Sequence, residues 1–197
     1  MDLGLRDRVA IVGGSSRGLG RAIAVAFAQE GASVTISART EADLRRTEIE
    51  LARIGSQHHV LAIPADLSLA RDIRRVVRDT INRFGQVGIM VTHVGFGPPG
   101  RPSEFSDETI MEAMEQNFLS AIRLTREVTP YMKQQRWGRI INITGLAARQ
   151  SGTIIGSMRN VSVAAMTKKL ADQLGPQGIN VTVVHPGLTR TERTAAW

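Results

Sequence analysis

The stretch 8-RVAIVGGSSRGLG-20 decides the fold of this chain. Its first half is a mostly apolar run, typical of a strand that is buried on both faces. Its second half places Gly14, Gly18 and Gly20 in a turn ahead of a segment with helical spacing. Glycines let backbone N–H groups approach a diphosphate closely, and the N-terminus of a helix favours its negative charge. The turn therefore predicts a nucleotide phosphate site, with a purely structural turn as the alternative.

The rest of the chain alternates predicted strands and helices. Apolar runs predict strands over 8–13, 33–38, 59–63, 88–92, 139–144 and 179–184. Amphipathic segments predict helices over 18–30, 41–54, 69–84, 107–135 with a kink at Pro130, and 157–174. Such a chain folds into an α/β, Rossmann-type doubly wound parallel sheet with strand order 3-2-1-4-5-6 and helices on both faces. We expect one domain over residues 1–197, with its ligand beyond the carboxyl ends of the strands.

Composition excludes several classes of function. The chain has no cysteine, which rules out disulfides and thiolate chemistry. No signal peptide or run of membrane-spanning length is evident, so we expect a cytoplasmic location and no membrane contact. The net charge of +7 fits either a solvated basic surface or a pocket for a phosphorylated ligand. Scattered arginines and an aromatic content of 4% argue against nucleic acid, and the histidines show no metal-like grouping.

The glycine spacing resembles the turn of the short-chain dehydrogenase/reductase family, T-G-x-x-x-G-x-G, with Gly13 at the threonine position. The resemblance extends over nearly the whole chain. It implies contacts to a dinucleotide from the turn, from beside the adenine, from the end of the fourth strand and from around the nicotinamide carboxamide. These residues are, in that order, Gly14, Ser15, Ser16, Arg17, Gly18, Leu19 and Gly20; Asp66 and Leu67; Gly95; and Pro186, Gly187 and Thr191.

The end of the second predicted strand indicates which dinucleotide is bound. An acidic residue there would accept a hydrogen bond from the ribose 2′-hydroxyl of NAD. This chain has Ala38 followed by Arg39, and Arg17 lies inside the glycine turn. Because guanidinium groups pair with phosphate, we predict NADP(H) rather than NAD(H). The alternative is that both arginines point into water.

The residues that would transfer the proton depart from the family pattern. The family uses a serine, a tyrosine and a lysine four residues after the tyrosine. With 139-RIINITGLAA-148 as register, these positions carry Gly145, Met158 and Ser162. The only tyrosine, Tyr131, has no lysine four residues later. Met158 is then best interpreted as an apolar filler.

Other polar residues remain candidates for that role. Asn117 matches an active-site asparagine of the family, and it either positions a water or ties backbone near the site. Histidine titrates near neutrality, but by the resemblance His93 lies nearer the cofactor ribose than the reacting carbon. Further hydroxyl, amide and guanidinium groups nearby are Thr144, Ser157, Arg159 and Asn160.

Three hypotheses follow from these observations. The chain is an NADP(H)-dependent oxidoreductase that acts on a carbonyl or alcohol by a non-standard site, or an inactive member that binds dinucleotide as a sensor or interaction subunit. The third is a structural subunit that binds nothing, against which the intact glycine turn argues. The resemblance also implies a homodimer or homotetramer through helices 107–135 and 157–174. It further implies a C-terminal lid and seventh strand, neither of which follows Thr191 in this sequence, and it leaves the substrate undefined.

Overall fold

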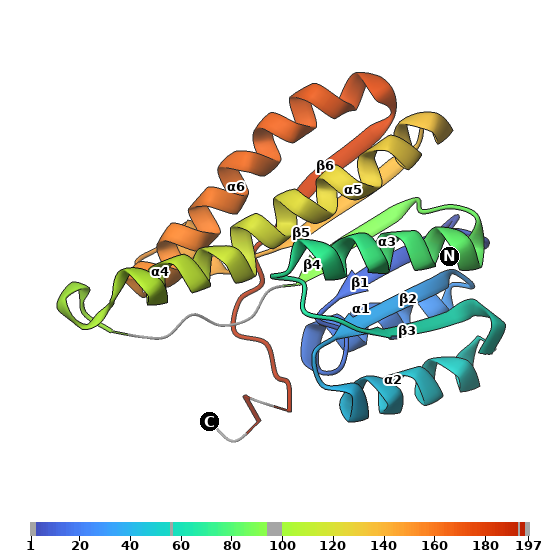
Figure 1. Ribbon diagram of the computed structural model, residues 1–197, viewed down its shortest axis with the longest axis horizontal. Coiled ribbons are helices and arrows are strands. Elements are labelled where there is room, and N and C mark those ends of the chain that lie inside the picture. The colour runs from blue at the N-terminus through green and yellow to red at the C-terminus, as the bar shows by residue number, and fades with distance from the viewer. Residues whose placement is uncertain (1–2, 56, 94–99, 193, 196–197) are drawn as a thin grey trace.

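A computed structural model describes residues 3–55, 57–93, 100–192 and 194–195. Six parallel strands form one sheet in the order β3-β2-β1-β4-β5-β6, which confirms the predicted topology (Figure 1). The strands are β1 (Val9–Gly13), β2 (Ser33–Ala38), β3 (Val60–Pro64), β4 (Ile89–His93), β5 (Gly138–Ile143) and β6 (Ile179–Val184). The order reverses direction between β1 and β4, so the carboxyl ends of these two strands flank a crevice.

Helices cover both faces of the sheet and build two apolar cores (Figure 1). Apolar side chains of α1 (Gly18–Gln29) and α2 (Glu41–Ile54) pack against one face. Those of α3 (Ala70–Phe84), α5 (Ser120–Gln135) and α6 (Ile154–Leu174) pack against the other. The strand β6 alternates buried and exposed residues, so it is not buried on both faces as the apolar-run argument expects. Its sequence INVTVV already carries that alternation.

The helix expected over 107–135 is interrupted by a wide turn that the sequence does not predict. It consists of α4 (Asp107–Met114), a π-helical turn η3 (Glu115–Leu119) and α5, and Pro130 lies within α5. The hydroxyl of Ser120 donates to the carbonyls of Gln116 and Asn117, both at 2.9 Å. The side chain of Ser120 thus bonds to the backbone of the π-helical turn that precedes it.

The helix α6 begins at Ile154 rather than at 157. Thr153 is its N-cap, and the Thr153 hydroxyl accepts from the N–H of Gly156 at 3.1 Å. The sequence predicts a start at Ser157, but the threonine before the apolar pair Ile154 and Ile155 caps the helix, which begins three residues earlier. A threonine at this position satisfies one of the unpaired N–H groups at a helix start.

A buried polar network fixes α6 to the sheet. The amide of Asn142 on β5 accepts from the Thr92 hydroxyl of β4 at 2.8 Å and donates to the Thr167 hydroxyl of α6 at 2.9 Å. All three side chains are buried. Because the groups are shielded from water, each depends on the others for its hydrogen bonds. The network therefore fixes the position of α6 against strands β4 and β5.

The Asn142→Ala variant tests this role. We expect the free energy of unfolding to fall by about 2–3 kcal/mol, because two buried hydrogen bonds are lost and the hydroxyl of Thr92 loses its acceptor on residue 142. Urea denaturation followed by circular dichroism measures the change. Asn180→Ala on the exposed face of β6 is the matched control, and we expect it to shift stability by less than about 0.5 kcal/mol. Equal effects in the two variants would contradict the assignment.

Candidate functional site

A cleft of about 470 Å³ opens at the carboxyl ends of β1, β2, β3 and β4. The segment that follows β6 lines another side, and Gln116, Ser120 and Leu124 of the π-helical turn and α5 also contribute. Most of the residues expected to contact a dinucleotide line this cleft: Gly14, Ser16, Arg17, Gly18, Leu19, Arg39, Asp66, Leu67, Gly187 and Thr191. Ser15, Gly20 and Pro186 lie outside its lining, and Gly95 lies outside the described residues. The fold thus gathers in one place residues that are scattered along the chain.

The glycine turn is held by contacts that only glycine permits. Gly14 has a φ of +65°, in the left-handed region that side chains disfavour. A Cβ on Gly20 would lie 2.2 Å from the carbonyl oxygen of Gly14. Ser15 is fully buried, where its hydroxyl donates to Val12 O and accepts from the N–H of Ser37, both at 2.9 Å. Ser15 and Gly20 therefore shape the turn from behind instead of facing the cleft.

The first turn of α1 faces the cleft with little capping of its own. Its N-cap, Arg17, makes no side-chain cap bond, and no acidic residue lies in the first turn. Unpaired N–H groups at a helix start, together with the helix dipole, make an anion site. One anion already uses it: a carboxylate oxygen of Glu192 accepts from the N–H of Gly18 at 3.0 Å. Sequence reasoning missed Glu192, because nothing local to residue 192 indicates a partner at residue 18.

The corner beyond β2 carries both expected arginines. Arg17 and Arg39 are exposed and line the cleft. Asp43 on α2 also lines it and forms an ion pair with Arg46. The hydroxyl of Ser37, at the cleft end of β2, is fully buried and has no hydrogen-bond partner in the described part of the chain. An unpaired buried hydroxyl beside a cleft is a position that a polar ligand can satisfy.

The carboxylate of Asp66 is engaged within its own loop. It accepts from the N–H of Ser68 at 2.9 Å and from the Ser68 hydroxyl at 2.7 Å. The N–H of Asp66 donates to Asp72 at 2.8 Å. These bonds are those of an Asx turn, and they hold the end of β3 in place at the cleft wall.

His93 ends β4 and lines the cleft next to the glycine turn. A Cβ on Gly14 would lie 2.9 Å from the His93 carbonyl oxygen, so the two backbones are in contact. Burial lowers the pKa of His93 from its ordinary value of 6.5. The imidazole is then neutral at neutral pH, which makes His93 a poor source of a proton there.

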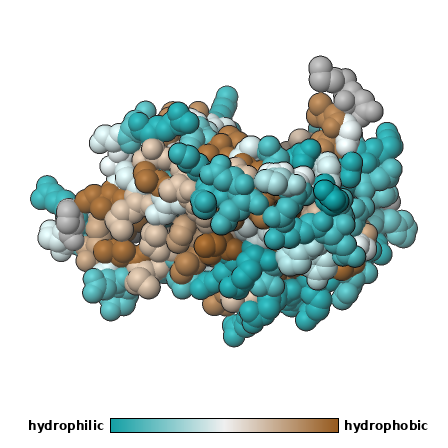
Figure 2. Space-filling model, turned by 90° about the horizontal axis from the view of Figure 1, so that it is seen from above, coloured by the Kyte–Doolittle hydropathy of each residue, from teal (hydrophilic) through white to brown (hydrophobic). Residues whose placement is uncertain are grey.

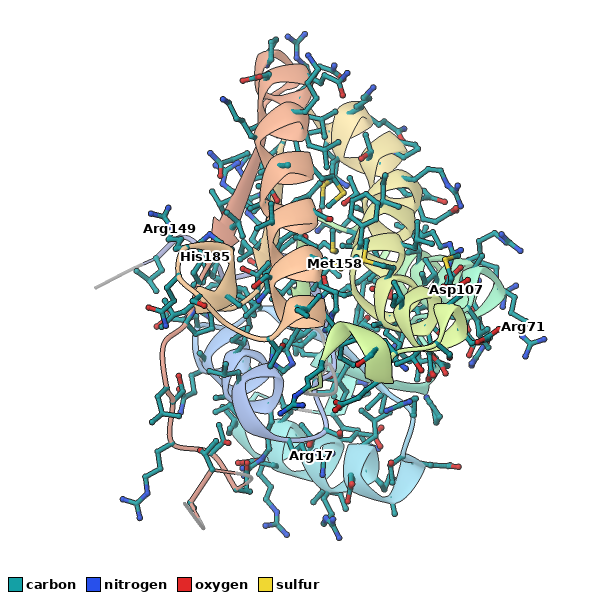
Figure 3. The ribbon with its side chains drawn as sticks, turned by 90° about the vertical axis from the view of Figure 1, so that its left-hand side faces the viewer. Arg17, Arg71, Asp107, Arg149, Met158 and His185 are labelled. Carbon is teal, nitrogen blue, oxygen red and sulfur yellow. The ribbon has the colours of Figure 1, made fainter. Side chains whose placement is uncertain are left out.

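Gly145, Met158 and Ser162, which the sequence predicts at the positions of the family's serine, tyrosine and lysine, do not line the cleft. Met158 is 42% exposed on α6, where Figure 3 shows it well separated from Arg17. The Ser162 hydroxyl donates to the carbonyl of Met158 at 2.7 Å, one helical turn earlier. Gly145 follows Thr144, whose hydroxyl lies 2.7 Å from Nδ1 of His185. The structure thus gives Thr144 an imidazole partner that the sequence did not indicate.

Asn117 is buried in the π-helical turn and meets a cation from α6. With its carboxamide oriented to satisfy both side chains, the Asn117 oxygen accepts from Nη2 and Nε of Arg159 at 2.9 and 3.3 Å. Arg159 is 3% exposed, and burial lowers the pKa of its guanidinium, which nevertheless stays protonated in proteins. The sequence offered a water or the backbone as partner of Asn117. The partner is instead a buried guanidinium, and neither residue lines the cleft.

Comparison with known proteins assigns the chain to a family. Residues 8–197 match the family described as short chain dehydrogenase, and the chain belongs to it. L-fucose dehydrogenase of Mus musculus is 34% identical over 183 residues, which are 91% of this chain and 64% of that protein. The uncharacterized oxidoreductase YvrD of Bacillus subtilis (strain 168) is 31% identical over 199 residues, all of this chain and 74% of that protein.

A solved structure supports the same assignment. L-sorbose reductase from Gluconobacter frateurii, complexed with NADPH and L-sorbose, has a TM-score of 0.93 and 30% identity. The alignment covers 98% of this chain and 74% of that one. The chain spans 64% of the mouse and 65% of the rat L-fucose dehydrogenase, which is less than two thirds of the length of each. In the described part of the chain, no helix is both long and apolar enough to cross a bilayer, and no three acidic, histidine or cysteine side chains are grouped to hold a metal ion.

The Gly20→Ala variant tests the geometry of the turn. The added methyl group would overlap the carbonyl oxygen of Gly14, so the turn or the helix has to shift. We expect a loss of about 1–3 kcal/mol in the free energy of unfolding, measured by urea denaturation. Gly175→Ala is the control, because a Cβ there meets nothing within 4 Å and its φ of −53° suits any residue. An unchanged stability of Gly20→Ala would refute the close approach.

Proposed function

We propose that this chain is an NADP(H)-binding oxidoreductase that interconverts a carbonyl and an alcohol on a small substrate. The observation that carries the proposal is the cleft itself: a glycine turn with a helix N-terminus on one side and two exposed arginines at the rim, Arg17 and Arg39. Family membership and oxidoreductase relatives support the reaction class. The neighbour solved with NADPH supports the nucleotide.

The residues present fit a phosphorylated dinucleotide. The first-turn N–H groups of α1 suit a diphosphate, and the buried, unpaired hydroxyl of Ser37 suits a polar group of the nucleoside. Arg17 and Arg39 suit a 2′-phosphate, because no acidic side chain directly follows β2 to pair with a free 2′-hydroxyl. The dinucleotide would supply the hydride when bound. Gly187 and Thr191, which line the far wall, would orient its nicotinamide end.

Proton transfer would fall to residues other than the family's tyrosine. The Thr144–His185 pair follows β5 and β6 at the carboxyl edge of the sheet, although neither residue is among those that line the cleft. A hydroxyl alone is a weak acid, but a hydrogen-bonded imidazole can relay a proton through it. The competing proposal is a member that binds dinucleotide without turnover. Its support is that Met158 and Ser162 offer the cleft no acid.

We also propose that the chain forms a homo-oligomer through α4, α5 and α6. Ile154, Met158 and Val161 are 40%, 42% and 50% exposed and lie at helical spacing on one stripe of α6. Met111 of α4 is 59% exposed. Figure 2 shows apolar surface gathered on the side of the molecule where Figure 1 places these helices. A stripe of this kind is typical of a surface covered by a partner, and it accounts for a methionine at 158.

Titration with NADPH and NADH by calorimetry tests the nucleotide assignment. We expect Arg39→Ala to weaken NADPH binding about tenfold or more and to leave NADH binding nearly unchanged, because only NADPH carries the 2′-phosphate. Arg71→Ala, on the exposed start of α3 and outside the cleft, is the control. Equal losses for both nucleotides would count against the assignment, and absence of binding by the unaltered chain would refute it.

The same samples decide between the enzyme and the non-catalytic binder. NADPH oxidation is followed over a panel of ketones and sugars that includes L-sorbose, and NADP⁺ reduction is followed with L-fucose; both sugars are chosen from the names of similar proteins. Turnover that Thr144→Val or His185→Gln reduces without weakening NADPH binding supports the proposed proton transfer. Tight NADPH binding with no oxidation across the panel supports the sensor or interaction subunit.

Sedimentation velocity tests the oligomer. We expect Val161→Asp to shift the chain toward the monomer, because a charge in an apolar interface has to be desolvated without a partner. Ile49→Asp on α2 is matched in exposure, 49% against 50%, and lies on the opposite face of the sheet. The control is expected to keep the assembly of the unaltered chain. A monomeric unaltered chain would exclude this interface.

A further inference from the structure

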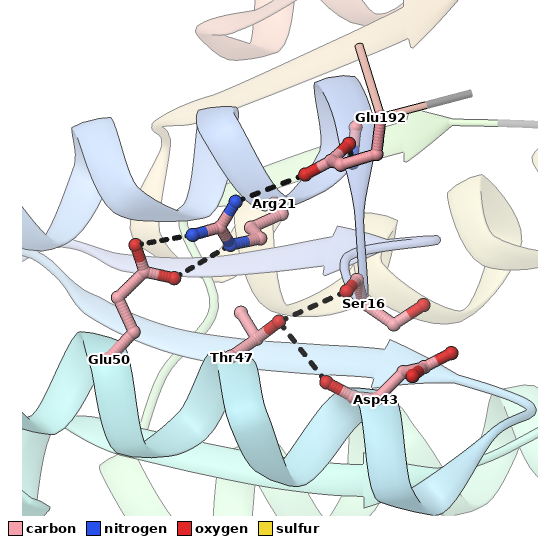
Figure 4. A network of polar contacts seen from close by, with 7 residues as sticks. Ser16, Arg21, Asp43, Thr47, Glu50 and Glu192 are labelled. Carbon is pink, nitrogen blue, oxygen red and sulfur yellow. Dashed lines mark hydrogen bonds and ion pairs between the residues drawn. The ribbon is translucent and has the colours of Figure 1, made fainter. Parts of the chain in front are cut away.

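Glu192 lies where a diphosphate is expected to bind. One of its carboxylate oxygens accepts from the N–H of Gly18 at 3.0 Å, at the first residue of α1. The other accepts from Nη1 of Arg21 at 3.1 Å (Figure 4). A carboxylate that accepts a helix-start N–H and a guanidinium N–H presents the same pair of oxygens that a phosphate would present. The protein therefore supplies its own anion to this site.

Arg21 is held in place independently of Glu192. Its Nε and Nη2 donate to both carboxylate oxygens of Glu50 on α2, at 2.7 and 2.8 Å (Figure 4). This bidentate pair fixes the plane of the guanidinium and leaves Nη1 directed at the N-terminus of α1. If Glu192 leaves, Arg21 keeps its position and Nη1 becomes free for another anion.

The segment around Glu192 is folded so that it presents the carboxylate. The hydroxyl of Thr194 donates to the carbonyl of Thr189 at 2.7 Å and accepts from the N–H of Thr191 at 2.8 Å. Thr189, Thr191, Glu192 and Thr194 all line the cleft. A Cβ on Gly18 would lie 3.7 Å from Thr191, so the segment rests directly on the glycine turn. We call residues 189–195, without the undescribed 193, the strap.

The charge state of Glu192 suits this contact. Its pKa is lowered from the ordinary value by the hydrogen bond of its own backbone N–H, with further lowering from the Gly18 N–H and Arg21, while slight burial opposes the shift. The carboxylate is therefore ionised at neutral pH. A diphosphate at the same N–H groups would bring like charges within a few ångströms, where they repel. Both anions do not fit at once.

We propose that Glu192 is an internal competitor: it occupies the anion site of α1 and has to leave, with the strap, before a dinucleotide diphosphate binds there. This regulation rests on the proposed function, since it concerns the same cleft. The apparent affinity for the nucleotide is then the intrinsic affinity multiplied by the fraction of molecules in which the strap is released. Because exposed ion pairs and helix-dipole contacts contribute little free energy, the competition is modest and readily reversed.

Calorimetric titration of Glu192→Gln with NADPH tests the competition. Removing the charge weakens the contact with Gly18 and Arg21, so we expect NADPH to bind about three- to tenfold more tightly than to the unaltered chain. Glu127→Gln on α5 removes the same charge far from the cleft and is expected to match the unaltered chain. Equal or weaker binding by Glu192→Gln, or an equal gain in Glu127→Gln, overturns the proposal.

A second titration with inorganic pyrophosphate separates this proposal from the proposed function. Pyrophosphate that binds Glu192→Gln more tightly than the unaltered chain supports the internal competitor, even if NADPH binds neither. NADPH that binds both equally well overturns the competitor and leaves the nucleotide assignment standing. Failure of both probes with both chains refutes the anion site and with it both proposals. Hydrogen exchange gives an independent readout, because the Gly18 amide is expected to exchange faster in Glu192→Gln without any ligand.

Discussion

The close approach of Gly20 to the carbonyl of Gly14 is the constraint on which the site depends. It folds the turn after β1 back onto the first turn of α1, and the buried hydroxyl of Ser15 fastens the turn to β1 and β2. The N–H groups at the start of α1 are thereby aimed at the cleft. Such N–H groups carry partial positive charges and attract any anion that lies close to them. A carboxylate of the chain itself can therefore occupy a position that suits a phosphate.

The parallel sheet brings the rest of the site to this turn. Because all six strands run the same way, the segments that follow them meet at one edge, although they are far apart in sequence. Arg39 follows β2, Asp66 follows β3, His93 ends β4 and Thr191 follows β6. The Asn142 network adds a fixed position for α6 against this edge. The topology of the sheet thus positions the cleft, and the segments that follow the strands supply the side chains that line it.

The π-helical turn and α5 contribute Gln116, Ser120 and Leu124 to the cleft, and α6 packs beside the turn. A buried guanidinium, Arg159, pairs with Asn117 in the π-helical turn, and three exposed apolar residues lie on one stripe in the first half of α6. A buried cation needs such a partner, since an unpaired one would cost several kilocalories per mole. The wide turn is therefore understandable as the backbone geometry that lets Asn117 meet Arg159. A buried polar pair thus joins α6 to the π-helical turn, while the segments that follow β1 and β2 contribute the glycine turn and the two exposed arginines of the cleft.

The sequence by itself determined the order of strands and helices, the glycine turn and the two arginines of the cleft rim, because these follow from local periodicity and from what glycine and arginine can do. It predicted a kink at Pro130, since proline is a local signal, but it did not predict the π-helical turn, in which Asn117 meets a residue 42 positions later. Only the tertiary structure decided the partners of Asn117, Thr144 and Glu192. The Glu192 contact joins residues 174 positions apart. Pairings over such separations depend on how the whole sheet closes, and no local pattern records them.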